Sequence, residues 1–416
     1  MASATDTPPG VVLPPPITER GGVGWAYANL FSTWYNTVLT FIYAALLGVA
    51  LWFGLSWIVL EADWKVIATL GGRLIIGQYN TEFACPGQNC FWRPQASLLL
   101  VSVLLGMAWA VSGDKAAKRI AIGVAAITVA FAFLPYSMDQ MGLDVRLLLV
   151  ANLPAVAAGW VLARYTPLGT VRWIVILGVL FFLVILVLVG GLPGVPGLQP
   201  VSTIYWGGLM LNLLLAVTGI TLSLPIGIAL ALGRRSSLPL VKLLCVVFIE
   251  VMRGMPLITL LFMSQVLVPL AFPQDFSTNS LFRAGVILTL FSSAYMAENI
   301  RGGLQALHPG QVEAARALGL AGWQTTLLIS LPQAIRNVIP AIVGQFISLF
   351  KDTLLVYIIG MLDVVEFSRA FIQGNAKYLA SARELFLFLA LVFWIFTYTM
   401  SYVSRRVEAH LRVGHR

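Results

Sequence analysis

An apolar run at residues 173–189 constrains this chain more than any other feature. It reads WIVILGVLFFLVILVLV and contains no charged residue. A helix needs about 20 predominantly apolar residues to cross the hydrocarbon core of a bilayer, and this run with its flanks is long enough. Charged residues make up only 10% of the chain, whereas soluble domains average about 25%. The sequence therefore predicts an all-α integral membrane protein.

Further apolar runs predict about ten membrane spans. The expected spans are 35–60, 96–113, 120–138, 147–163, 173–190, 207–232, 240–271, 283–302, 335–357 and 384–404. The fourth is the weakest, because Pro154 interrupts it, and the seventh is too long for one straight crossing. We expect the seventh to project beyond the membrane or to bend at Pro256, which has no backbone N–H. Eight spans is the alternative, since dropping two would leave both termini on the same side.

Basic residues orient the chain. A topology with both termini in the cytoplasm places about twice as many Lys and Arg residues inside as outside, as the positive-inside rule requires. This bias explains the net charge of +9 without nucleic acid, because the sequence has no basic stripe with interleaved aromatic residues. The first 24 residues are rich in proline and lack the apolar core of a signal peptide. We expect them to form a disordered or loosely docked tail.

Two cysteines lie in a loop that this topology places outside. Cys85 and Cys90 flank a Pro-Gly turn in the stretch FACPGQNCFW. Disulfides persist in the outer compartment. We therefore predict a disulfide between them, with two free thiols as the alternative.

The sequence argues against an enzyme. No lysine follows a glycine, so the phosphate-binding motif GxxxxGK[ST] is absent. The histidines, His308, His410 and His415, form no spaced metal pair. We therefore expect no metal site, no covalent chemistry and no cofactor bound by this chain.

The most informative segment is a predicted cytoplasmic loop that begins at His308 and reads HPGQVEAARALGLAGWQTTLLISLPQAIR. Its spacing, EAA-x3-G-x9-I-x-LP, resembles the EAA signature of permease subunits of ABC importers. The matching residues are Glu313, Ala314, Ala315, Gly319, Ile329, Leu331 and Pro332. The resemblance implies a short helix that docks on a separate ATPase subunit, which would bind ATP and Mg. The residues suit this role: the alanines leave a narrow helix surface, Gly319 can end the helix, and Pro332 can pre-set the turn into the next span.

Other segments resemble the polar amino-acid branch of the same family. They are FIEVMRGMPLITLLF at 248–262, AYMAENIRGGLQAL at 294–307 and FISLFKDTLL at 346–355, where Leu354 replaces the usual serine. The resemblance covers about 201–416 and, with the extra N-terminal spans, is most like permeases of general L-amino-acid uptake. It implies a type I importer core of five spans, a second homologous permease, two ATPase subunits and an extracytoplasmic amino-acid-binding protein.

These features predict three parts of the chain. They are a Pro-rich cytoplasmic tail at 1–34, a membrane extension at 35–200 with an outer loop at 61–95, and a permease core at 201–416 with a coupling loop at 303–334. No motif assigns a role to the extension, which would scaffold the core, enlarge the contact with a second permease or bind lipid.

Polar residues at membrane depth are candidates for the translocation path, because placing them there is costly. The candidates are Glu250, Arg253, Tyr295, Glu298, Gln345, Ser348, Lys351 and Asp352. Glu250 and Arg253 are spaced i,i+3, as are Glu298 and Arg301, so each pair can form an ion pair on one helix face. The open alternatives are structural ion pairs and contact with the carboxylate of an amino acid, for which Arg253 is the first candidate.

Three other functions stay open. A permease for another small polar solute, such as an opine or a polyamine, would carry the same loop. An ion-coupled secondary transporter would need no ATPase-docking loop, and a non-transporting scaffold subunit would be dispensable for uptake. The loop favours an ATP-driven importer of amino acids in the plasma (inner) membrane.

Overall fold

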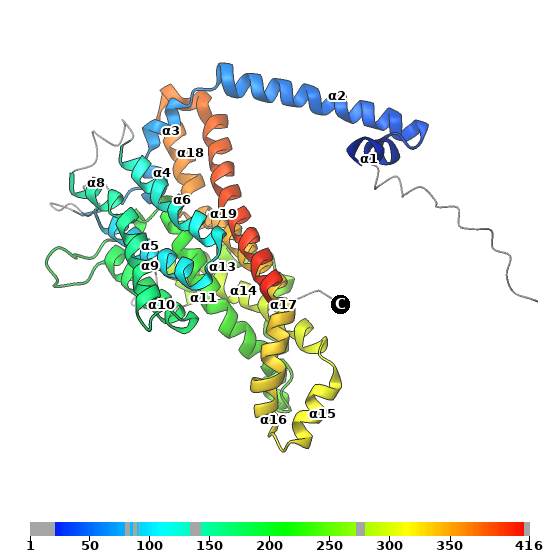
Figure 1. Ribbon diagram of the computed structural model, residues 1–416. Helices are drawn as coiled ribbons and strands as arrows, with labels where there is room; N and C mark the ends of the chain where they lie inside the picture. Colours follow the sequence, from blue (N-terminus) through cyan, green and yellow to red (C-terminus); the bar gives the residue numbers. More distant parts are fainter. Residues whose placement is uncertain are drawn as a thin grey trace, which may run out of the picture. The chain divides into compact units, whose positions relative to one another are not determined.

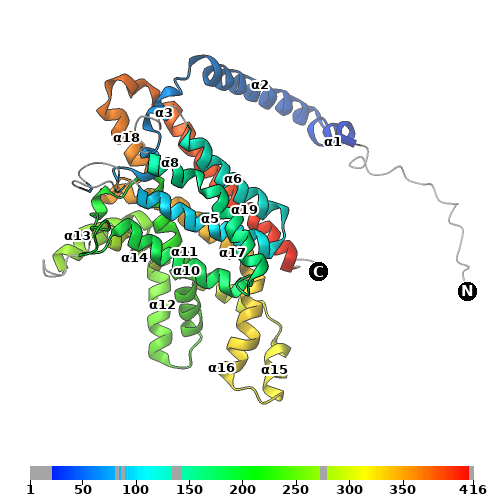
Figure 2. The ribbon, with the colours of Figure 1, turned by 60° about the vertical axis from the view of Figure 1, so that its left-hand side comes forward.

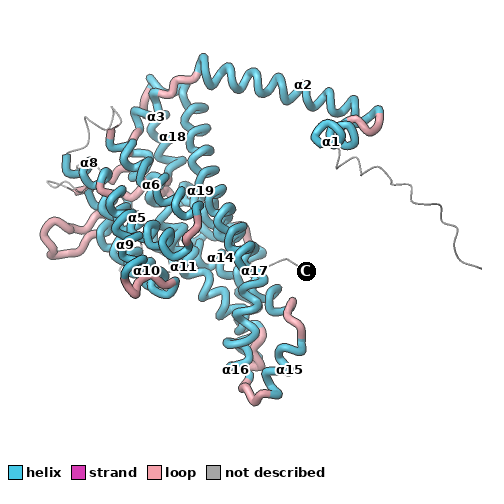
Figure 3. Tube along the Cα trace, viewed as in Figure 1, coloured by secondary structure: helices cyan, strands magenta, loops and turns pink. Residues whose placement is uncertain are grey.

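The computed structural model describes residues 21–79, 84–85, 90, 92–133, 143–271 and 279–411 of the protein. Throughout this part of the chain, helices alternate with turns and loops, and there is no strand (Figure 3). The all-α class predicted from the sequence is therefore confirmed. Contacts within the chain define two compact units, residues 1–63 and 64–416.

The first unit contains a long apolar helix. α1 (Gly21–Leu30) precedes α2 (Trp34–Ser56), and the Thr33 side chain accepts a hydrogen bond in the first turn of α2. A π-helical turn, Trp57–Glu61, extends α2 to 28 residues, which is long and apolar enough to cross a membrane. The first predicted span is thus present. Residues 21–30, which we placed in the tail, are helical instead.

In the second unit, several helices precede residue 200 (Figure 1). They are α3 (Lys65–Leu70), α4 (Arg73–Ile76), α5 (Trp92–Ser112), α6 (Lys115–Ala132), α8 (Leu143–Val150), α9 (Asn152–Tyr165) and α10 (Val171–Gly190). By length and composition, α5 and α10 can cross a membrane. The weak fourth span is broken into α8 and α9, and Pro154 lies in the first turn of α9, where its missing N–H leaves no bond unmade.

α5 and α9 pack with their backbones in close contact. A Cβ added to Gly106 would lie 2.1 Å from the Val156 carbonyl oxygen, and one added to Gly159 would lie 2.0 Å from that of Val103. The buried Ser102 hydroxyl donates to Asn152 Oδ1 at 2.6 Å across the same interface. Small residues that admit a neighbouring backbone are typical of membrane helix pairs.

The remaining elements form the expected core. They are η3 (Thr203–Tyr205), α11 (Gly208–Arg234), α12 (Pro239–Gly254), α13 (Leu257–Ala271), α14 (Ser280–Gln305), α15 (Pro309–Ala317), α16 (Gly322–Gln324), η5 (Thr325–Ser330), α17 (Leu331–Asp352), η6 (Thr353–Ile359), α18 (Val364–Gly374), η7 (Ala376–Ser381) and α19 (Ala382–Leu411). α11 packs most extensively on α14, and α17 is the next most extensive partner of α14.

The described helices provide candidates for eight of the ten expected spans. Seven are long and apolar enough to cross a membrane, and α12 with α13, bent by 105° at their break, makes an eighth. The bend predicted at Pro256 is therefore confirmed. α6, with three basic residues at its start, and the broken pair α8 and α9 occupy the positions of the other two predicted spans, although residues 134–138 lie outside the described part.

α3 and α18 lie at one end of the second unit, which we call the α18 side (Figures 1 and 2). At this end, glycines allow close contact between the backbones of the extension and the core. A Cβ on Gly77, after α4, would lie 2.6 Å from Gly207 Cα. Gly208 has a φ of 61°, and its N–H donates to the Leu362 carbonyl at 3.0 Å. Only glycine allows this three-way backbone contact and this conformation without strain.

Two buried polar side chains, Arg93 and Tyr79, donate hydrogen bonds to backbone carbonyls in this part of the second unit. Arg93, in the first turn of α5, is fully buried and donates to the carbonyls of Gln199 and Gly197 at 2.9 and 3.0 Å. The hydroxyl of buried Tyr79 donates to the Val189 carbonyl at 2.6 Å, and burial raises the pKa of this tyrosine to about 12. The Arg93 bonds hold the loop between α10 and α11 against α5, and the Tyr79 bond joins the segment before α5 to α10.

Cys85 and Cys90 form a disulfide in the loop that precedes α5, with their Cα atoms 6.1 Å apart. Both cysteines are buried in the same apolar cluster as Tyr79. The pairing agrees with the disulfide that their spacing suggested.

Candidate functional site

The loop between α14 and α17 protrudes at the end of the second unit opposite α18 (Figures 1 and 2). We call this end the α15 side. α15 ends before Gly319, whose φ of 79° lies in the left-handed region. The N–H groups of Gly319 and Leu320 donate to the carbonyls of Arg316 and Ala315. These bonds satisfy carbonyls at the end of the helix, which is the usual role of a terminal glycine.

Large apolar side chains on this loop face outward. Leu318 is 83% exposed, Trp323 is 66% exposed and Leu328 is 62% exposed. Of the two motif alanines, Ala315 is buried and Ala314 is exposed. The loop therefore presents an apolar surface around the glycine, and exposed apolar surface of this kind marks interaction sites.

Ile329, Leu331 and Pro332 lie where the loop returns toward the core. The π-helical turn Thr325–Ser330 leads directly into α17, and Pro332 lies in the first turn of α17. Residues 322–359 thus form one continuous helical run. Pro332 therefore lies at the start of the next span, as predicted, and a first helical turn accepts proline because its N–H would have no partner there. The π-turn makes the entry into the span helical.

Five charged side chains meet where α11, α12 and α14 approach one another. They are Arg234, Glu250, Arg253, Glu298 and Arg301, here called the Glu298 cluster. Glu298 Oε1 lies 2.5 Å from Arg234 Nη1 and 3.8 Å from Arg253 Nη1. Its Oε2 accepts hydrogen bonds from Arg301 at 2.8 Å. One carboxylate, 14% exposed, therefore holds three guanidinium groups from three helices.

The i,i+3 pair predicted between Glu250 and Arg253 is present, but it is the longest contact in the cluster. Their closest charged atoms are 4.0 Å apart, whereas Glu250 lies 3.1 Å from Arg234 and Arg253 lies 3.8 Å from Glu298. The predicted i,i+3 pair between Glu298 and Arg301 is confirmed. Because three arginines face two glutamates, the cluster carries a surplus positive charge.

Arg253 is the member of the cluster nearest the break between α12 and α13. It is the second-last residue of α12, and its side chain is 35% exposed. Its guanidinium carbon lies 5.7 Å from the ring centre of Tyr295 on α14. A cation over an aromatic face is stabilised and oriented. Arg253 is therefore both fixed in place and open to solvent at a helix break.

The other path candidates lie farther along α17. The Gln345 amide approaches the Ser292 hydroxyl at 3.5 Å, which places it beside α14, and Ser348 is half-buried. Lys351 and Asp352 end α17, with Lys351 exposed and Asp352 half-buried. The structure thus brings Glu250, Arg253, Tyr295 and Glu298 together and leaves the α17 residues outside this cluster.

Two groups escaped sequence reasoning. The first is Arg234, which the sequence places only among the charges of a loop. The signal that could have indicated its role is the Arg234-Arg235 pair at the end of an apolar span. On the α18 side, buried Asn212 donates to Thr353 Oγ1 at 3.1 Å and to Asp363 Oδ2 at 3.4 Å. Burial raises the pKa of Asp363 to about 6. Asp363 caps α18, a role that the sequence D-x-x-E could have indicated.

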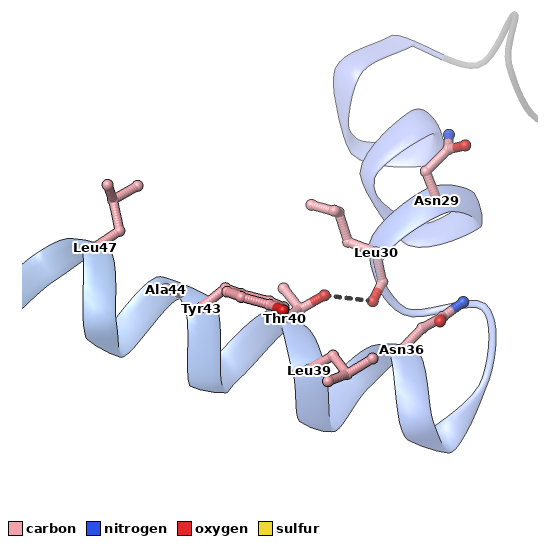
Figure 4. A pocket seen from close by; sticks show the side chains of 8 residues that line it. All are labelled: Asn29, Leu30, Asn36, Leu39, Thr40, Tyr43, Ala44 and Leu47. Carbon is pink, nitrogen blue, oxygen red and sulfur yellow. Dashed lines mark hydrogen bonds between the residues drawn. The ribbon is translucent and has the colours of Figure 1, made fainter.

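Two open hollows lie away from these charges. One of about 340 Å³ lies between α1 and α2, where the Thr40 hydroxyl donates to the Leu30 carbonyl at 2.8 Å (Figure 4). The other, of about 520 Å³, lies between the ends of α11 and α12 and is lined by apolar residues and Cys245. Neither lining includes a charged side chain, and no group of His, Cys, Asp and Glu in the described ranges could hold a metal ion.

Comparison with known proteins identifies the family. Residues 223–413 match the binding-protein-dependent transport system inner membrane component family. The chain is 36% identical to the inner membrane amino-acid ABC transporter permease protein YhdY of Escherichia coli K12, over 94% of this chain and 93% of that protein. It is 33% identical to the glutamate/glutamine/aspartate/asparagine transport system permease protein BztC of Rhodobacter capsulatus, over 97% and 96%.

Shorter relatives match only half of the chain. The probable glutamine ABC transporter permease GlnP of Bacillus subtilis is 34% identical over 49% of this chain and 91% of that protein. A crystal structure of an amino acid ABC transporter with histidines covers 48% of this chain and 91% of its own, with 31% identity and a TM-score of 0.43. On the near-full-length matches, this chain is a multi-pass inner-membrane protein that belongs to the family of amino-acid ABC transporter permeases.

Proposed function

We propose that this chain forms half of the translocation path of an ATP-driven amino-acid importer and couples it to ATPase subunits through the 308–332 loop. The carrying observation is the apolar surface of that loop, where exposed Leu318 and Trp323 flank the left-handed Gly319. Covering the exposed apolar side chains of a protruding loop with a partner protein lowers the free energy. As a permease subunit the chain is not itself an enzyme, and ATP and Mg would bind the partner.

The full assembly would contain a second homologous permease, two ATPase subunits and an extracytoplasmic amino-acid-binding protein. Because the loop must meet a cytoplasmic ATPase, the α15 side would face the cytoplasm together with both termini. The bias of basic residues toward the segments expected inside supports this orientation. The extension before residue 200 would serve as a membrane scaffold for the core.

The Glu298 cluster would provide a binding site for the carboxylate of the substrate. Its surplus positive charge resides on a partly exposed guanidinium, Arg253, beside a helix break. A guanidinium matches a carboxylate with two parallel hydrogen bonds. The same surplus would repel a polyamine, so the cluster favours substrates that carry a carboxylate. Membership of an ABC family leaves the ion-coupled alternative without support.

The loop assignment is tested by Gly319→Val, with Gly319→Asn as the matched control. A β-branched residue at this φ costs about 1–2 kcal/mol, whereas asparagine tolerates the left-handed region. A Cβ at Gly319 would meet no atom within 4 Å, so neither variant introduces a steric clash, and the strain of valine falls on the backbone of the loop. We expect Gly319→Val to reach the membrane, lose ATPase co-purification and abolish uptake, while Gly319→Asn retains both. Normal ATPase retention and uptake by Gly319→Val would contradict the assignment.

A further inference from the structure

A second group of charges lies outside the Glu298 cluster. It consists of Lys115, Lys118 and Arg119 on α6, Arg164 on α9, and Arg405 and Arg406 on α19, here called the basic rim. All six side chains belong to exposed residues. The proposed coupling mechanism uses none of them.

Side-chain interactions near the basic rim connect four helices. Arg406 on α19 interacts electrostatically with Asp114, the residue before α6. Lys118 lies 5.5 Å from the ring centre of Trp109 on α5, and Trp109 lies 5.8 Å from Trp160 on α9. Trp160 in turn lies 6.4 Å from Tyr165, next to Arg164. These interactions connect α19 to the start of α6 and, through three aromatic rings, connect Lys118 on α6 to the end of α9.

The acidic groups of the rim are engaged locally. Asp114 Oδ1 accepts from the Ala116 N–H at 3.1 Å and so caps α6. Glu408 accepts from the Ser404 hydroxyl at 2.8 Å on its own helix. Over the described ranges, no carboxylate forms an ion pair with the six cations within 4.0 Å.

Neutral groups hold the two α19 arginines in place. Arg405 donates to Ser401 Oγ at 3.3 Å, and Arg406 donates to the Tyr402 hydroxyl at 3.0 Å. Their guanidinium carbons also lie 6.0 and 5.4 Å from the rings of Tyr398 and Tyr402. The arginines are therefore oriented without being neutralised, which leaves their charge available to an external anion.

We propose that the basic rim binds the phosphate groups of anionic phospholipids. Tryptophan and tyrosine favour the depth of lipid headgroups, and clustered Lys and Arg beside membrane helices attract anionic lipids. Because Lys118 belongs to the extension and Arg406 to the last core helix, one headgroup layer would tie the two parts together.

The test measures binding of fluorescent phosphatidylglycerol to the purified full-length chain in a neutral detergent, with phosphatidylcholine as the uncharged probe. The test variant is Lys118→Gln with Arg406→Gln. The matched control is Arg235→Gln with Lys242→Gln, which removes two exposed cations from the hairpin between α11 and α12. Both variants lower the net charge from +9 to +7.

Each Lys or Arg near an anionic surface contributes about fivefold in affinity, so the test variant should bind phosphatidylglycerol about 25-fold more weakly. The control should bind as the wild type does, and Lys118→Arg with Arg406→Lys should retain binding because charge is kept. Equal weakening in the control would show that net charge alone acts and would overturn the proposal. Unchanged binding in the test variant, or full displacement by glycerol phosphate, would overturn it as well, the latter in favour of a soluble phosphate ligand.

Discussion

Exchanging the charges of Glu250 and Arg253 should damage this protein, although two residues spaced i,i+3 would usually tolerate a swap. After Glu250→Arg, the new arginine faces Arg234, which lies 3.1 Å from Glu250 in the wild type. After Arg253→Glu, the new glutamate faces Glu298, which lies 3.8 Å from Arg253. The swap therefore replaces two attractive contacts between helices with two repulsive ones, and it restores only a 4.0 Å contact.

The magnitude follows from these distances. In a medium of effective dielectric constant about 20, two unit charges at 3–4 Å interact by about 4–5 kcal/mol before solvent screening. Solvent reduces this strongly, because the Glu250 side chain is 53% exposed and that of Arg253 is 35% exposed. Exposed pairs contribute about 0.2–1 kcal/mol each. Reversing the sign of two partly screened contacts should cost about 2–3 kcal/mol, more than Glu250→Gln or Arg253→Gln alone.

The assay combines uptake with the thermal stability of the detergent-purified chain, both measured for the two single variants and the swap. We expect the swap to be less stable than either single variant and to restore no uptake. The control is the swap of Glu366 with Arg369 on α18, an i,i+3 pair at 3.8 Å that forms no other ion pair within the described residues. That swap should change stability by only a few tenths of a kcal/mol. Recovery of wild-type stability and uptake by the Glu250/Arg253 swap would refute the shared-carboxylate interpretation.

Three further predictions concern the rest of the chain. Burial raises the pKa of Asp363 to about 6, so its ionisation should lower thermal stability as the pH rises from about 4 to about 6, and Asp363→Asn should flatten this dependence. Gly159→Ala should cost about 1–3 kcal/mol in thermal stability, because its Cβ would lie 2.0 Å from a carbonyl oxygen, whereas Gly123→Ala, with nothing within 4 Å, should be neutral; equal melting temperatures would contradict the packing. Cys85 and Cys90 should react with an impermeant maleimide only after reduction, and labelling of both in untreated cells would show free thiols.

The sequence predicted the features that depend on neighbouring residues. Apolar runs marked the spans, because length and composition alone decide whether a helix can cross a bilayer. Pro256 marked the break between α12 and α13, since proline cannot continue the hydrogen bonding of the preceding helix. Gly319 marked the end of α15, because glycine readily adopts the left-handed conformation that ends a helix, and this conformation is observed.

Contacts between distant segments were not predictable in the same way. The spacing of Glu250 and Arg253 shows that they share a helix face, but not that Arg234 and Glu298, 64 residues apart, lie closer to them than they lie to each other. The reciprocal fit of Gly106 and Gly159 likewise depends on how α5 and α9 pack. A periodic pattern indicates which face of a helix is buried, whereas the partner of that face is set by tertiary packing.

In the proposed importer, the position of Glu298 on α14 would link the 308–332 loop to the translocation path. α14 ends at Gln305, and α15 begins at Pro309, so the loop follows the helix that carries the cluster almost directly. Glu298 lies seven positions before Gln305 on one continuous helix, which is about 10 Å at 1.5 Å per residue. A displacement imposed on the loop would therefore reach Glu298 through a rigid element. Because Glu298 also holds Arg234 and Arg253, the same displacement would act on α11 and on the end of α12 beside its 105° break.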